Sequence, residues 1–145
     1  MNVKIKKLNE RAIIPTYGSP YAAGADLYAC IETEEIIKPN ETKLIKTGLA
    51  IELPIGYAAF IYARSGLASK RGLAPANKVG VVDADYRGEV MVALHNHSSE
   101  AQTVGVGERI AQMVIAPFLK ADFTVVEELS DTQRGAGGFG STGTK

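Results

Sequence analysis

The sequence predicts an all-β domain, a sandwich or barrel of short strands with one short helix. Runs rich in β-forming residues alternate with turn signals spaced roughly 8–12 residues apart, which is typical of such folds. No long stretch keeps helical periodicity. The chain has 145 residues with 15 glycines and 6 prolines, which fits one domain with many turns. Neither an internal repeat nor a dividing linker is present.

The expected strands differ in how they alternate. Residues 3–6 alternate apolar and charged side chains, as a half-buried strand does, whereas residues 90–94 form a continuous apolar run suited to a buried strand. The full set is 3–6, 42–46, 57–62, 90–94, 110–115 and 123–126. Turns are expected at 39–40, 54–56, 87–88, 96–99 and 105–107, where glycine, proline, asparagine or serine recur.

The short helix is expected at residues 65–71, with Ser65 as its cap and Gly72 as its stop. It begins directly after a strand that ends in Arg64, Ser65 and Gly66. Backbone N–H groups at a helix start favour an anion, and the arginine and serine add further donors. The segment therefore indicates either a phosphate site or an ordinary helix start beside a surface arginine.

The last twelve residues, 134–145, contain five glycines and one large apolar side chain. Such a segment cannot build a core, so we expect a domain over residues 1–133 and a mobile tail over 134–145. With Arg134, Gly140, Ser141 and Thr142 the tail can also wrap donors around phosphates, and Phe139 can stack on a base. It lacks the Lys-Ser/Thr pair of a Walker A loop. A merely flexible end is the alternative.

Composition excludes several classes of function. Sixteen basic and sixteen acidic residues give a net charge of zero, which argues against a broad cationic surface for nucleic acid. No apolar run approaches the ~18 residues of a membrane span, and the N-terminus lacks the apolar core of a secretion signal. The single cysteine, Cys30, cannot form an intrachain disulfide, so a cytoplasmic protein is expected.

Two carboxylates, Asp83 and Asp85, follow the apolar run that begins at Gly80, with Tyr86 beside them. Side chains two residues apart share a face in extended chain. A carboxylate in this position can orient and deprotonate a water molecule. The alternative is an Asp-rich turn that closes a hairpin.

Other polar residues give weaker signals. Gln112 interrupts an apolar strand, so it must either satisfy the backbone or face a ligand. His95 and His97 lie two residues apart, but no third metal ligand stands near them in sequence. Cys30 follows an apolar run and is interpreted as a small core residue.

Five segments in order resemble the five motifs of the homotrimeric dUTPases. The resemblance covers about residues 6–142, and five ordered motifs with this spacing are a specific signal. The segments are residues 23–29 (AGADLYA), 63–68 (ARSGLA), 80–88 (GVVDADYRG), 107–112 (GERIAQ) and 134–143 (RGAGGFGSTG).

The resemblance implies a jelly-roll-like protomer and a homotrimer in which each of three active sites draws motifs from all three chains. It implies hydrolysis of dUTP to dUMP and diphosphate with Mg²⁺ on the triphosphate. This reaction keeps uracil out of DNA and supplies dUMP for dTMP synthesis. Backbone groups suit uracil recognition, because a site that hydrogen-bonds one base edge rejects the wrong edge strongly.

The resemblance also assigns roles to residues. Asp83 activates the water that attacks the α-phosphorus, Asp26 holds magnesium through water, and Tyr86 lies under the deoxyribose and leaves no room for a 2′-hydroxyl. The uracil slot is the hairpin with Asn77, Gly80 and Val82 that runs to Asp83. The phosphate-gripping residues are Arg64, Ser65, Gly66 and Gln112, with Ser65 counted as catalytic beside Asp83. The closing tail supplies Arg134, Phe139, Gly140, Ser141 and Thr142.

One residue departs from the family pattern: Lys78 stands where an uncharged residue is frequent. Two alternatives share the fold. A dCTP deaminase would carry a catalytic glutamate on the strand after the aspartate hairpin, and residues 90–94 contain no carboxylate. A non-catalytic nucleotide-binding regulator is disfavoured by the intact Asp83 and the complete glycine-rich tail.

Overall fold

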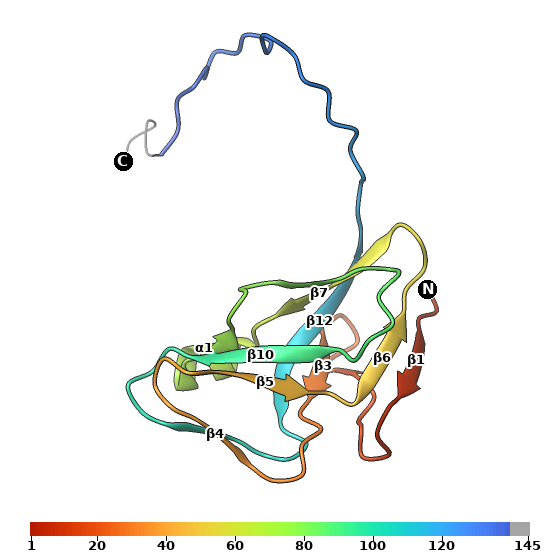
Figure 1. Ribbon diagram of the computed structural model, residues 1–145, viewed down its shortest axis with the longest axis vertical. Helices are drawn as coiled ribbons and strands as arrows, with labels where there is room; N and C mark the ends of the chain where they lie inside the picture. The colour runs from red at the N-terminus through yellow and green to blue at the C-terminus, as the bar shows by residue number, and fades with distance from the viewer. Residues whose placement is uncertain (140–145) are drawn as a thin grey trace.

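The computed structural model describes residues 1–139, so Gly140, Ser141 and Thr142 of the predicted tail site lie outside the described residues. The chain forms short strands and one short helix (Figure 1). The strands are β1 Lys4–Lys7, β2 Thr16–Tyr17, β3 Ala25–Tyr28, β4 Glu35–Ile37, β5 Thr42–Lys46, β6 Leu49–Glu52, β7 Tyr57–Tyr62, β8 Leu73–Pro75, β9 Gly80–Val82, β10 Met91–Asn96, β11 Gln102–Val104 and β12 Arg109–Pro117, and the helix is α1 Ser65–Arg71.

All strand pairs described are antiparallel. The largest sheet has the order β2-β3-β12-β7-β9, a second has β5-β10-β8, and two ribbons pair β1 with β6 and β4 with β11. Apolar side chains from these sheets bury one core, whose most enclosed members include Leu27, Ile37, Ile45, Leu94 and Ile110. Burial of such side chains is the main stabilising term of a fold like this one. The predicted all-β class with one short helix is confirmed.

The helix has the predicted bounds but not the predicted cap. Ser65 is the first helical residue, and Arg64 occupies the N-cap position with an extended backbone and no side-chain capping hydrogen bond. The predicted stop is confirmed: Gly72 adopts the left-handed conformation at φ 65° and its N–H bonds the Ala68 carbonyl oxygen at 3.1 Å. Glycine suits this position because it has no Cβ to clash there.

Within residues 1–139 no helix is long and apolar enough to cross a membrane.

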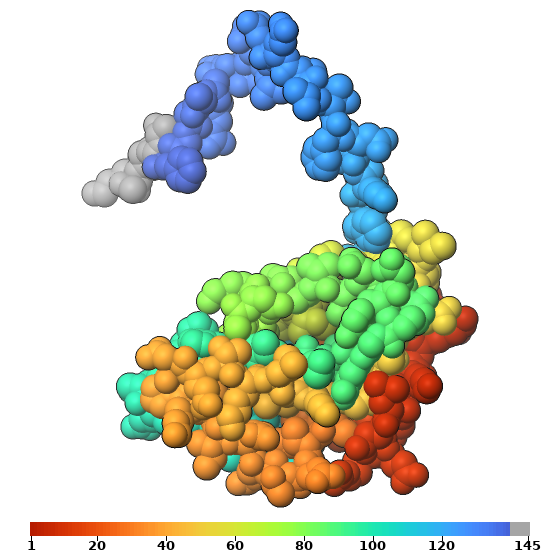
Figure 2. Space-filling view, in the orientation of Figure 1, coloured from red at the N-terminus to blue at the C-terminus, as the bar shows by residue number. Residues whose placement is uncertain are grey.

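The predicted strand at 123–126 is wrong. After β12 the chain leaves the body and arches away from it, as the blue segment in Figures 1 and 2 shows, and residues 118–139 contain no helix or strand. Several large apolar side chains here are almost fully exposed, among them Leu119, Phe123 and Val125. Several large apolar side chains exposed along one segment are unusual on the surface of a monomeric protein.

Candidate active site

A polar cluster lies on one face of the largest sheet, built around Asp26 of β3. Asp26 pairs across the strands with Gln112 of β12 and with Thr16 of β2, while Arg109 pairs with Tyr28. Residues 109 and 112 would point to opposite faces of a regular strand, but a β-bulge between Arg109 and Ala111 shifts the register. The bulge therefore brings Arg109 and Gln112 to the same face as Asp26, as bulges beside functional sites commonly do.

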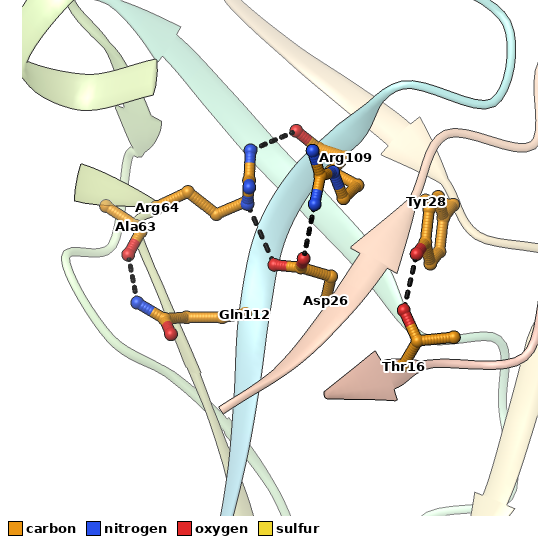
Figure 3. Close-up of polar contacts among 7 residues, drawn as sticks. All are labelled: Thr16, Asp26, Tyr28, Ala63, Arg64, Arg109 and Gln112. Atoms are coloured by element: carbon orange, nitrogen blue, oxygen red, sulfur yellow. Dashed lines mark hydrogen bonds and ion pairs between the residues drawn. The ribbon is translucent and has the colours of Figure 1, made fainter. Parts of the chain in front are cut away.

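Two arginines hold the carboxylate of Asp26 (Figure 3). Arg64 Nε donates to Asp26 Oδ1 at 2.8 Å, and Arg109 Nη1 donates to Oδ2 at 3.3 Å. Arg64 Nη1 also reaches the Arg109 carbonyl oxygen at 3.5 Å. Asp26 is only 8% exposed, so its charge needs such partners. Two guanidinium groups on one carboxylate leave a local excess of positive charge in a chain of zero net charge, which suits an anionic ligand.

Gln112 lies beside this cluster and satisfies the backbone. Its Nε2 donates to the Ala63 carbonyl oxygen at 2.9 Å, next to Arg64 (Figure 3). The amide carries a second hydrogen and an acceptor oxygen, so it retains polar capacity for a ligand. Gly24 makes room for this side chain, because a Cβ at Gly24 would come closer than 3.0 Å to Gln112 Oε1. Ser65 and Gly66 start the helix beside Arg64, and both are exposed.

A cavity of about 290 Å³ lies elsewhere, between strand β10 and the stretch of chain that runs from β8 through β9 to Tyr86. Five of the predicted site residues line it together: Asn77, Gly80, Val82, Asp83 and Tyr86. Asp85 is not among its lining residues in the described chain. Asp83, to which the resemblance assigns activation of water, therefore borders the cavity, and Asp85 does not.

The turn between β8 and β9 is formed by main-chain contacts, and these two strands belong to different sheets. The N–H of Lys78 donates to the Pro75 carbonyl oxygen at 3.0 Å, and that of Val79 to the Asn77 carbonyl oxygen at 2.7 Å. Lys78 has a left-handed φ of 64°, which is uncommon for a lysine. Its side chain is exposed. The lysine at this position therefore affects the site through the backbone conformation of the turn.

Asp83 follows directly after β9 and is exposed, and no side chain within residues 1–139 hydrogen-bonds its carboxylate. The Tyr86 N–H donates to the Asp83 carbonyl oxygen at 3.2 Å, which closes the turn between them. A carboxylate at a cavity edge with its oxygens uncommitted is positioned to accept a proton from water.

One chain does not bring all the predicted site residues together. Among residues 1–139, no hydrogen bond or ion pair joins the Asp26 cluster to the residues that line the cavity. Arg134 and Phe139 lie in the extended segment, where Arg134 Nε bonds the Gly137 carbonyl oxygen at 2.7 Å and Phe139 is fully exposed. The structure therefore shows two separate groups of site residues and a third on the segment that leaves the body.

Sequence reasoning missed Arg109. It stands inside one of the motif segments, three residues before Gln112, but regular strand geometry would have placed it on the other face. Of the two histidines, His95 bonds Thr42 Oγ1 through its Nδ1 at 2.9 Å. No group of three or more possible metal ligands occurs in the described part of the chain. Desolvation and the neighbouring His95 ring lower the pKa of His97.

The sequence model of the dUTPase family matches residues 10–143. The chain belongs to this family. It is 57% identical over 143 residues to the deoxyuridine 5′-triphosphate nucleotidohydrolase of Nautilia profundicola, covering 99% of both chains. It is 50% identical to the enzyme of the same name from Hydrogenobaculum sp., covering 100% of both.

Solved structures agree with the family assignment. The dUTPase of Staphylococcus bacteriophage 80alpha, solved with dUPNHPP, aligns with a TM-score of 0.86 and 29% identity over 99% of both chains. A mutant dUTPase from phage phi11 of S. aureus, described for its coordination of a structural Mg(II) ion, aligns with a TM-score of 0.78 and 25% identity, covering 88% of this chain and 98% of that one. The dUTPase fold therefore holds for the chain.

Proposed function

We propose that this protein hydrolyses dUTP to dUMP and diphosphate by attack of water on the α-phosphorus. The observation that carries the proposal is the 57% identity to a named dUTP nucleotidohydrolase over 99% of both chains. The site geometry supports it, because the cationic cluster around Asp26 suits the phosphates of a nucleotide and the cavity beside Asp83 suits its nucleoside. The reaction removes dUTP and yields dUMP, the precursor that dTMP synthesis requires. A nucleotide substrate and a single cysteine support a cytoplasmic enzyme.

The phosphates are proposed to bind at the Asp26 cluster. Arg64 supplies charge, Gln112 supplies an amide, and the start of α1 supplies the Ser65 hydroxyl and the N–H groups of Ser65 and Gly66, which have no partner inside the helix. Ser65 is assigned a catalytic role because it would donate to oxygens on which negative charge develops. Fixed donors at such oxygens stabilise the transition state.

The nucleoside is proposed to bind in the cavity. Main-chain groups from Asn77 through Val82 would read the uracil edge, and the Tyr86 ring would lie under the deoxyribose. Asp83 would accept a proton from water while the water oxygen forms a bond to the α-phosphorus. The bond from that phosphorus to the bridging oxygen then breaks, and diphosphate leaves with the electron pair.

Mg²⁺ fits the residues that are present. This ion keeps several waters and is usually held by one or two carboxylates together with substrate phosphates. The Asp26 carboxylate has lone pairs beyond those used by two arginines, so Asp26 would meet the ion through water while the triphosphate supplies the inner ligands. When bound, the ion neutralises charge on the triphosphate.

Release of diphosphate from dUTP tests the proposal directly. We expect rapid release with Mg²⁺, strong loss on adding EDTA, and very low activity on UTP and dCTP, each measured by a coupled diphosphate assay. Ammonia release from dCTP would instead support the deaminase alternative. Binding of dUTP without any turnover would support a regulator. Equal activity on dUTP and UTP would contradict the role of Tyr86.

A homotrimer with shared sites is the proposed assembly. The cavity and the phosphate cluster share no residue, and no side-chain hydrogen bond joins them within residues 1–139. The extended segment carries exposed apolar side chains that a neighbouring copy can cover. A closed ring of three copies would bring one group from each chain to every site.

Mixing two inactive variants tests this sharing. Asp83→Asn and Gln112→Ala, unfolded together in equal amounts and refolded, are expected to recover up to about a quarter of wild-type activity, since random assembly gives that share of sites both native residues. Each variant refolded alone is the control. No recovery in the mixture would mean that Asp83 and Gln112 of one site come from the same chain.

A further inference from the structure

The ring of Tyr86 lies against a glycine. A Cβ built on Gly88 would be 2.5 Å from Tyr86 Cζ and 2.9 Å from Cε2, and nearer still to the hydroxyl oxygen. A point this close to Oη and Cζ and farther from Cε2 lies over the face of the ring rather than beside its edge. The outer half of the Tyr86 ring therefore rests with one face on the main chain of Gly88.

The backbone does not require glycine at this position. Within residues 1–139 the glycines with left-handed φ are Gly48, Gly56, Gly72, Gly107 and Gly135. Gly88 is not one of them, so an L-residue can adopt its conformation without the strain that such a φ imposes. The three atoms that a Cβ at Gly88 would approach most closely all belong to Tyr86, so this side chain is what opposes a side chain at Gly88.

The hydroxyl of the same ring is tied to a rigid part of the fold. Tyr86 Oη donates to the Glu89 carbonyl oxygen at 3.0 Å, and Glu89 Oε1 accepts from the Gly48 N–H at 2.8 Å. The next residue, Val90, receives a 2.5 Å hydrogen bond on its carbonyl oxygen from the fully buried Thr47 hydroxyl. Two contacts therefore fix the position of the Tyr86 ring: the main chain of Gly88, which has no side chain, and the hydrogen bond from the hydroxyl to the Glu89 carbonyl oxygen.

We propose that Gly88 is a positioning residue that sets the depth of the sugar site. Tyr86 lines the cavity, whereas Gly88 is not among its lining residues, so the glycine supports the ring from the side away from the cavity. Because Gly88 has no side chain, the Tyr86 ring can lie close to the main chain and leave room in the cavity for a 2′-deoxyribose. The inference rests on the proposed function, in which the sugar lies on Tyr86, and it names the residue that makes room for that sugar.

A methyl group at Gly88 would move the ring rather than unfold the protein. Ordinary contact begins at 3.4 Å, so the ring must lift by about 1 Å, and a misplacement of that size at a reacting site can cost about 10²-fold in rate. Tyr86 is 42% exposed, so it can shift without disturbing the core. The ring would be displaced toward the cavity, which would reduce the space for the sugar.

The test is Gly88→Ala in two backgrounds, native and Tyr86→Leu, because leucine lacks the hydroxyl oxygen and the two ring carbons that the new methyl group would meet. In the native background we expect kcat/KM for dUTP to fall about tenfold to hundredfold and dUMP binding, measured by calorimetry, to weaken in the same direction. In the Tyr86→Leu background the same substitution should change kcat/KM by no more than about twofold, since the effect of one substitution depends on a second residue only where the two interact. Gly18→Ala, where a Cβ would meet nothing within 4 Å, is the matched control and should match wild type.

An unchanged kcat/KM in Gly88→Ala, or an equal fall in both backgrounds, would overturn the proposal. The dUMP titration separates this result from failure of the proposed function. If the wild type binds dUMP but does not hydrolyse dUTP, the proposed reaction is wrong, and the effect of Gly88→Ala on dUMP affinity still decides the role of Gly88. If the wild type binds neither nucleotide, both proposals fail.

Discussion

Asp83→Asn is expected to lower kcat for dUTP by about 10²–10⁴-fold, the usual contribution of a general base. Asparagine is nearly isosteric with aspartate but cannot accept the proton of the attacking water. Because Asp83 is exposed and no side chain in the described chain pairs with its carboxylate, its loss should cost little stability. Turnover is measured by diphosphate release, and binding by titration with a non-hydrolysable dUTP analogue.

Asp85→Asn is the matched control for this prediction. Asp85 lies in the same turn and is also exposed, but it does not line the cavity. We expect its amide variant to keep kcat within a few-fold of wild type and the melting temperature of both variants to stay close to native. Near-normal turnover in Asp83→Asn, or unfolding of that variant, would make Asp83 a structural turn residue.

The helix and most strands were predictable because their signals are local. Gly72 ends α1 through its own left-handed conformation, and the run at 57–62 becomes β7 with the predicted bounds. The strand at 123–126 was wrongly predicted because β propensity measures how well side chains suit a pleated, half-buried surface. Phe123 and Val125 suit such a surface, but within residues 1–139 no strand pairs with them.

The site was predictable in its residue types but not in its geometry. The resemblance pointed to Asp26, Arg64 and Gln112, which the structure brings together. It gave no role to Arg109. Strand periodicity could not supply one, because a one-residue bulge decides the face of the sheet on which that side chain lies. Nor does spacing reveal that Gly88 supports the Tyr86 ring, since two residues apart in a turn can take many arrangements. Contacts that depend on bulges and turns need coordinates.

Deletion of residues 134–145 is expected to leave thermal stability nearly unchanged while activity on dUTP falls by about 10²-fold or more. The described part of this segment bonds only to itself and to Thr132, whose carbonyl oxygen accepts from the Gly135 N–H at 3.1 Å. Thr132 belongs to the extended stretch after β12, so the core loses nothing. The deletion removes Arg134, Phe139 and the hydroxyls of Ser141 and Thr142. Closing segments of this kind complete a catalytic set and exclude water. Activity is measured by diphosphate release and stability by thermal melting at fixed protein concentration.

A fluorescent variant shows whether the segment acts by closing on the nucleotide. The native chain has no tryptophan, so Phe139→Trp introduces a single indole at a fully exposed position. Its emission should change when a non-hydrolysable dUTP analogue and Mg²⁺ are added, because the ring becomes desolvated as it stacks on the base. The change should be much smaller with dUMP, which lacks the β- and γ-phosphates that Arg134 would bind, and dUMP should still bind the truncated protein. A truncated protein with full activity, or an indole that does not respond to the triphosphate, would show that the segment takes no part in the reaction.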